Sequence, residues 1–191
     1  MTLTRIIPSL RRTLPDPMNH DFWPEETVAT PTDVVVSGLS LLRLVDVCGT
    51  PCVHGGAAVI PGTGGRPSAS GKATVVIVRV TRLATHISGA PVIETDAQLD
   101  TLRLIWSEIR LIGRASTARS GRLFIARQPT NPNLALTTNV VAVELPLDVR
   151  VGELLVIPRL PLATSGTPDS TTGSTPDSSA ANRPNWLSAL E

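Results

Sequence analysis

The sequence predicts an all-β protein: a small barrel or sandwich with one short helix, an extended N-terminal arm and a low-complexity C-terminal tail. From residue 57 onward, short runs of Val, Ile and Leu alternate with clusters of Gly, Pro, Asn and Ser, which is the spacing of a β domain. Both chain ends are poor in such runs. We therefore divide the chain into an extended N-terminal arm (1–31), a β-rich domain (32–161), a Ser/Thr/Pro-rich linker (162–182) and a C-terminal docking peptide (183–191).

Composition narrows the class of protein. The 191 residues, 41% of them hydrophobic, are enough for one core of ordinary size with extensions. The 17 basic and 16 acidic residues leave a net charge of +1, which creates no general field for nucleic acid. The chain lacks a long apolar run and a secretory signal, and its two cysteines are too few for a disulfide framework. We expect a protein made in a cytoplasm, without a membrane contact.

Prolines at positions 8, 15, 17, 24 and 31 favour an extended conformation for the N-terminal arm. Within it, Phe22 and Trp23 are adjacent, although the chain has only 2 Phe and 3 Trp residues. Two interpretations stay open. The two rings either cover one end of the domain's own core or anchor the arm on a neighbouring subunit.

The domain begins with a β-branched run over residues 33–38, followed by a helix. Ser40 is placed as the N-cap of that helix, and Gly49 followed by Pro51 ends it. Its apolar stripe consists of Leu41, Leu42, Leu44 and Val45.

Strands are then predicted over residues 57–61, 72–83, 91–99, 121–128, 139–147 and 152–160. Residues 102–116 alternate less cleanly; we favour a strand over 110–116, and a helix over 96–109 remains an alternative. Residues 145–158 resemble the ribbon that closes a small barrel, because an alternating segment is joined through Gly152 to a buried run.

The C-terminal tail repeats Thr-Pro-Asp-Ser at residues 167–170 and 175–178, and it cannot bury enough surface to fold alone. Its last residues differ, because Trp186, Leu187 and Leu190 would share one face of a helix. A linker of about 20 residues reaches roughly 25 Å. These three side chains can therefore fold back on their own domain or dock on another subunit.

The glycine-rich stretch from Pro61 to Val78 does not match a phosphate-binding loop. Such a loop needs Ser or Thr after the lysine and a helix behind it, whereas Ala73 follows Lys72 and a strand is predicted next. We interpret residues 62–71 as a mobile loop between two strands.

Cys48, Cys52 and His54 lie close together in the sequence, but a closed zinc site needs a fourth ligand, and a cysteine nucleophile needs an orienting group for its base. We expect packing residues here and no catalytic, metal or cofactor site. A small metal-binding or enzymatic module around these three residues remains the alternative of another class.

The middle of the chain is locally basic, because Glu108 is the only acid among its arginines. A solvated face or ion pairs between subunits is favoured, and contact with DNA phosphates is the alternative. The arginines are those at positions 103, 110, 114, 119, 122 and 127.

Several stretches together resemble small virion proteins of tailed actinobacterial phages, a group that includes head-to-tail connector, minor capsid and tail components. The resemblance spans residues 5–160 and is carried by "SLRRTLPDP", "FWPEETV", "DVVVSGLSLLRLVDVCGTPCVH", "VIPGTGGRPS" and "LPLDVRVGELLVIP".

This resemblance implies a structural subunit of a phage virion, without enzymatic activity or cofactor, made in the host cytoplasm. It would form a homo-oligomer and bind other virion structural proteins at the head-to-tail junction or on the tail. A minor capsid or decoration protein of the head is the alternative. The low-complexity arms gain burial only from another subunit, which makes Phe22, Trp23, Trp186, Leu187 and Leu190 the expected partner-binding residues.

Overall fold

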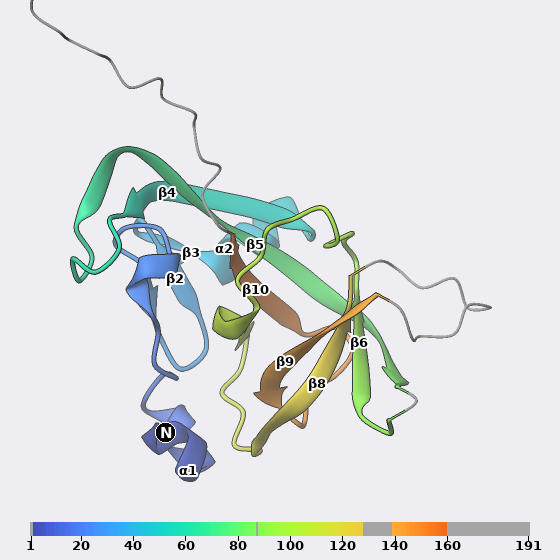
Figure 1. Ribbon diagram of the computed structural model, residues 1–191. Helices are drawn as coiled ribbons and strands as arrows, with labels where there is room; N and C mark the ends of the chain where they lie inside the picture. The colour runs from blue at the N-terminus through green and yellow to red at the C-terminus, as the bar shows by residue number, and fades with distance from the viewer. Residues whose placement is uncertain (1, 87, 128–138, 160–191) are drawn as a thin grey trace, which may run out of the picture.

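The computed structural model describes residues 2–86, 88–127 and 139–159 and confirms the all-β class. A curled sheet forms a half-barrel, a small three-stranded sheet lies beside it, and α2 is the one helix of ordinary length (Figure 1). In the described part of the chain, no helix is long and apolar enough to cross a bilayer. The elements are α1 (Leu3–Ile6), η1 (Pro8–Arg12), η2 (His20–Phe22), β1 (Val28–Ala29), β2 (Val34–Val36), β3 (Leu39–Ser40), α2 (Leu41–Cys48), β4 (Cys52–Val59), β5 (Pro67–Thr85), β6 (Pro91–Thr95), η3 (Trp106–Glu108), β7 (Arg110–Ile112), β8 (Ser120–Ala126), β9 (Val140–Pro146) and β10 (Leu154–Arg159).

Strand β5, 19 residues long, organises the larger sheet. The sheet runs in the order β7-β10-β5-β6-β8-β9, and β4 pairs with β5 off this path. The first half of β5 pairs with β4, its middle with β10 and its end with β6. All pairs are antiparallel except β6 with β8. One strand therefore connects the β4–β5 ribbon to the half-barrel.

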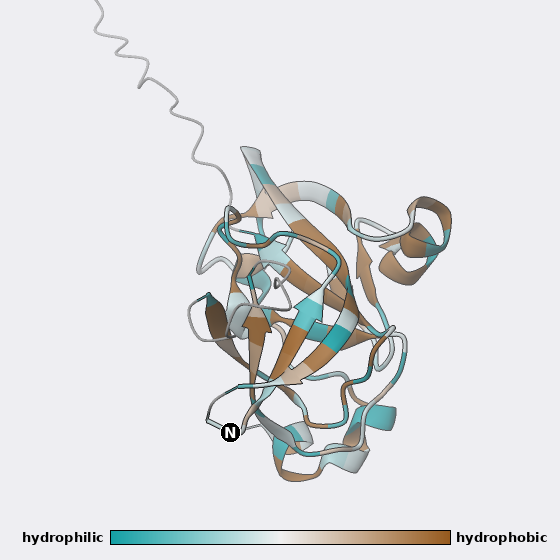
Figure 2. Ribbon diagram, turned by 90° about the vertical axis from the view of Figure 1, so that its right-hand side faces the viewer, coloured by the Kyte–Doolittle hydropathy of each residue, from teal (hydrophilic) through white to brown (hydrophobic). Residues whose placement is uncertain are grey.

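The core lies on both sides of β5. Val76 and Val78 face the cluster inside the half-barrel, whereas Val75 and Ile77 face a second cluster that contains Trp23. Strand β10 alternates between the two clusters in the same way. Because both faces of these strands are buried, their sequences are continuous runs of hydrophobic residues with no alternation of apolar and polar positions (Figure 2).

Helix α2 confirms the predicted start and stop signals. The Ser40 hydroxyl accepts a hydrogen bond from the Arg43 backbone N–H at 3.2 Å. Gly49 ends the helix with φ of 73°, a conformation that favours glycine. Leu41 and Val45 are buried against the cluster around Trp23.

The other strand predictions are confirmed with shifted ends. The uncertain segment contains strand β7 and, of the alternative helix over 96–109, only the short turn η3. The glycine-rich loop joins strands β4 and β5, but it is shorter than the predicted 62–71, because residues 67–71 already belong to β5.

The predicted closing ribbon over residues 145–158 is wrong. Strand β9 pairs with β8, and β10 pairs with β5 and β7, so the two segments are not partners. The chain after β9 instead leads β10 to a place between β7 and β5. The alternation of apolar and polar residues predicted where the strands lie in the sequence but not which strands pair. Pairing depends on contacts between residues far apart in the chain.

The N-terminal region also differs from the expected extended arm. Short helical turns, α1, η1 and η2, replace extended chain between residues 3 and 22. Pro8 does not prevent this, because it occupies the first position of η1, where a missing N–H breaks no helical hydrogen bond.

Candidate functional site: an arginine clasp under the N-terminal segment

Residues 2–18, here called the N-terminal segment, lie against the half-barrel through polar side chains. Thr4 and Arg11 are buried at 4% and 5% exposure, seven positions apart on the side that faces the domain. Thr4 belongs to α1 and Arg11 to η1, and the non-helical Ile7 lies between the two elements. The inward face of the segment is therefore polar.

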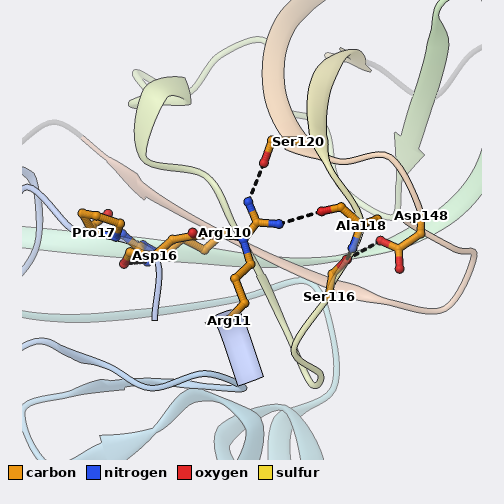
Figure 3. Close-up of polar contacts among 8 residues, drawn as sticks. All are labelled: Arg11, Asp16, Pro17, Arg110, Ser116, Ala118, Ser120 and Asp148. Atoms are coloured by element: carbon orange, nitrogen blue, oxygen red, sulfur yellow. Dashed lines mark hydrogen bonds and ion pairs between the residues drawn. The ribbon is translucent and has the colours of Figure 1, made fainter. Parts of the chain in front are cut away.

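Arg11 makes the central contacts of this attachment (Figure 3). Its Nη1 donates to the Ala118 carbonyl at 2.8 Å and its Nη2 to the Ser120 hydroxyl at 2.6 Å. Its Nε donates to the Asp16 carboxylate at 2.9 Å. The planar fork of a guanidinium suits this geometry, because it can bind three acceptors in fixed directions.

Arg110, on strand β7, holds the next turn of the segment. It donates from Nη1 to the Asp16 carbonyl at 2.8 Å and from Nη2 to the Pro17 carbonyl. Its guanidinium also lies 5.9 Å from the centre of the Trp23 ring. Burial lowers the pKa of Arg110, and the charges of Glu108 and Asp16 act against that change. We call Arg11, Arg110 and Asp16 the arginine clasp.

Trp23 is fully buried, at 0% exposure, in the cluster beneath α2. Its Nε1 donates to the Glu108 carboxylate at 3.1 Å, which also accepts the Asn19 backbone N–H at 3.2 Å. Phe22 is half-buried against the same cluster. Of the two interpretations, covering the domain's own core therefore applies to Trp23. Its ring is buried by its own chain and is not exposed to a partner.

A third arginine, Arg114, joins the loop after β7 to the turn before β10. It donates to Asp148 at 2.8 Å and also binds Glu153. The hydrogen bond to Glu153 raises the pKa of Arg114. Burial alone would raise the pKa of Asp148. The hydrogen bonds from Arg114 and Ser116 have the larger combined effect, so the pKa of Asp148 is lowered.

A cleft of about 270 Å³ lies between the N-terminal segment and the domain. Arginines line it, but acidic partners already face several of them, including Glu144 beside Arg5 and Asp16 beside Arg11. Paired charges of this kind hold two surfaces together and leave little net field for an anion. The chemistry of the cleft is therefore that of an internal interface.

The locally basic stretch is partly used inside the protein. Arg110 and Arg114 bind the chain itself, and Arg122 lies 5.4 Å from the centre of the Phe124 ring. Contact with nucleic acid through the remaining arginines stays a prediction.

The candidate metal or nucleophile site shows no assembled chemistry. Cys48 is exposed at the end of α2 and Cys52 is half-buried in β4, and both are free thiols. Burial raises the pKa of Cys52, and the nearby Cys48 and Asp96 raise it further, which disfavours the reactive thiolate. In the ranges that the structure describes, no three His, Cys, Asp or Glu side chains gather to hold a metal.

Trp186, Leu187 and Leu190 lie outside the described residues. The clasp itself was not predicted from the sequence, although one signal was present. Thr4, Pro8, Arg11 and Pro15 recur at helical spacing beside an apolar series at Leu3, Ile7, Leu10 and Leu14.

No protein-family model matches the chain, and no curated protein matches it in sequence. What the protein does is therefore inferred from its own residues and geometry.

Proposed function

We propose that the protein is a structural subunit of a phage virion, which assembles as an oligomer at the head-to-tail junction or on the tail. The class comes from the resemblance that the sequence motifs within residues 5–160 suggest, and the comparisons with known proteins do not test it. The structure adds two surfaces on this half-barrel that suit contact with another subunit.

The observation that carries the proposal is an apolar stripe that faces away from the domain. Leu3, Ile6, Ile7 and Leu14 are 65%, 59%, 47% and 48% exposed. The backbone orders them, because Ile7 donates to Leu3 at 2.8 Å, Leu10 to Ile7 at 3.1 Å and Leu14 to Leu10 at 2.8 Å. Leu3, Ile7, Leu10 and Leu14 therefore follow one another in steps of three or four residues, although Ile7 itself is non-helical (φ −123°, ψ 84°) between α1 and η1. We call Leu3, Ile6, Ile7, Leu10 and Leu14 the outer stripe.

An amphipathic segment normally turns its apolar face to the core. Here Thr4 and Arg11 take that place, so the outer stripe gains nothing from the fold of its own chain. Exposed apolar patches of this kind mark interaction sites. The arginine clasp fixes the segment in advance, which lowers the entropy that a partner must overcome.

The β4–β5 ribbon offers a second surface. In the described ranges, β5 residues 67–73 pair with β4 alone, because β10 joins β5 only from Thr74 onward. Among the described residues, one backbone edge of the ribbon therefore has no partner strand. Open strand edges favour addition of a strand from another chain.

The test of assembly is sedimentation velocity and negative-stain microscopy of the purified full chain from low to high micromolar concentration. We expect a species of fixed subunit number, seen as closed rings or regular particles. A 20.2 kDa monomer at every concentration would contradict the proposal.

The virion assignment has its own test. Mass spectrometry of purified particles from the phage that encodes this chain should detect it in a constant ratio to the other structural proteins. Its absence from the particles would remove the virion role and leave only an oligomeric β protein.

A further inference from the structure

We infer that the outer stripe of one copy receives the C-terminal peptide, residues 183–191, of a neighbouring copy. The inference rests on the proposed assembly and names the segment that covers the stripe. It is argued from the chemistry of that peptide, from the surface that would receive it and from where the described chain ends.

The peptide has the composition of a docking segment. Beyond Leu162, the large apolar residues of the chain are Trp186, Leu187 and Leu190, after a long stretch of small and polar residues. Their spacing would place them on one side of a helix. A short apolar helix face laid against another apolar surface is a common mode of peptide recognition.

The outer stripe has the complementary features. It extends along α1 and η1 to Leu14, and four of its five Leu and Ile side chains are exposed. Arg12 is exposed on the same segment and forms no ion pair within the described part of the chain. Glu191 follows Leu190 directly. A bound peptide could therefore add a charge pair at the rim of an apolar contact.

The position of the last described residue favours a neighbouring copy over the same chain. Arg159 pairs with Thr74, where β5 enters the β4–β5 ribbon. Figure 1 shows this ribbon at the upper end of the molecule and the N-terminus at the lower end. A linker over residues 160–182 spans about 25 to 30 Å on average. A domain of this size is about 40 Å across, and an internal path must go around it.

Such an exchange is directional, because each copy donates a peptide at one end and receives one at the other. Contacts of this type close into rings when the rotation between copies allows it, and otherwise form open chains. This matches an oligomer at a junction between two virion parts.

The experiment uses two full-length variants. Ile6→Asp with Ile7→Asp gives a variant with a damaged stripe and an intact peptide. The second variant has an intact stripe and a damaged peptide; it carries Trp186→Ser, Leu187→Ser and Leu190→Ser together. Val47→Asp, on an 85% exposed side chain of α2, is the matched control for a charge placed on an exposed apolar residue. Circular dichroism and urea unfolding establish that each variant folds.

We expect each variant alone to associate about 30-fold or more weaker than the wild-type chain, as for loss of a strong interface residue. The Val47→Asp control should associate like the wild type. An equimolar mixture of the two variants should form a dimer of twice the 20.2 kDa chain mass and grow no further, because only one stripe and one peptide remain intact.

Other outcomes would contradict either the inference alone or the proposed assembly as well. A mixture that stays monomeric overturns the inference. Variants that assemble like an oligomeric wild type also overturn it and leave the proposed assembly standing. A wild type that is itself monomeric removes the proposed assembly together with the inference.

Discussion

The N-terminal segment and strand β5 belong to the same molecule but are attached to it by opposite means. Strand β5 buries apolar side chains on both faces, including Val75 and Val76. The segment buries Thr4 and Arg11 and leaves every residue of the outer stripe except the half-buried Leu10 exposed to solvent. One region is held by apolar burial and the other by hydrogen bonds and ion pairs.

The difference shows which surface serves the fold and which is free for another role. Removing apolar area from water stabilises β5 by about 25 cal/mol for each square ångström buried, whereas the outer stripe contributes little of this within one chain. Trp23 marks the boundary, since its ring is the first large apolar side chain that enters the core. The segment before it should open locally at lower free energy than the half-barrel.

The largest expected effect comes from the half-barrel. Leu155→Ala removes a side chain at 0% exposure and should lower the free energy of unfolding by about 2 to 5 kcal/mol. Leu3→Ala, at 65% exposure, should change it by less than about 0.5 kcal/mol. Urea unfolding of both variants measures the difference. Equal losses would mean that the outer stripe supports the fold.

The clasp should show an intermediate effect. Arg11→Ala removes the hydrogen bonds to Asp16, Ala118 and Ser120 and should weaken docking of the segment by about 1 to 3 kcal/mol. Arg12→Ala changes an exposed neighbour and is the control. Limited proteolysis should cut the Arg11→Ala chain before residue 20 while the half-barrel stays intact. Equal cleavage of the two variants would contradict the role of the clasp.

Acid should weaken the Arg114–Asp148 contact inside the domain. The pKa of Asp148 is lowered in the folded protein, so its contribution is complete above the unfolded value of about 4 and is lost as the pH falls through the folded value. The urea midpoint should therefore fall as the pH is lowered below about 4. Asp148→Asn should flatten this slope, and an unchanged slope would exclude Asp148 as its source.

The smallest effect belongs to the exposed pair of Arg5 and Glu144, whose side chains are 48% and 44% exposed. Glu144→Gln should change the free energy of unfolding by no more than about 1 kcal/mol, and the change should shrink in high salt. A larger loss that salt does not affect would show that this pair belongs to the clasp.

The sequence predicted the parts of the fold that depend on neighbouring residues. Ser40 and Gly49 bounded α2 correctly, because capping is a local interaction. The clasp could not be found in this way, since Arg11 and Ser120 are 109 positions apart and neither stands out as a motif. The pairing of β10 was missed for the same reason. The sequence alone cannot decide between the two interpretations of Trp23, because the residues around its ring come from distant elements.

The most direct measurement is a cysteine proximity experiment in full chains that carry Cys48→Ser and Cys52→Ser. Ile6→Cys in one chain and Leu187→Cys in another are mixed under mild oxidation, with Val47→Cys as the control partner for the peptide cysteine. We expect a disulfide-linked dimer to form much faster with Ile6→Cys than with Val47→Cys. Equal rates for the two would contradict the claim that a neighbour's C-terminal peptide covers the outer stripe.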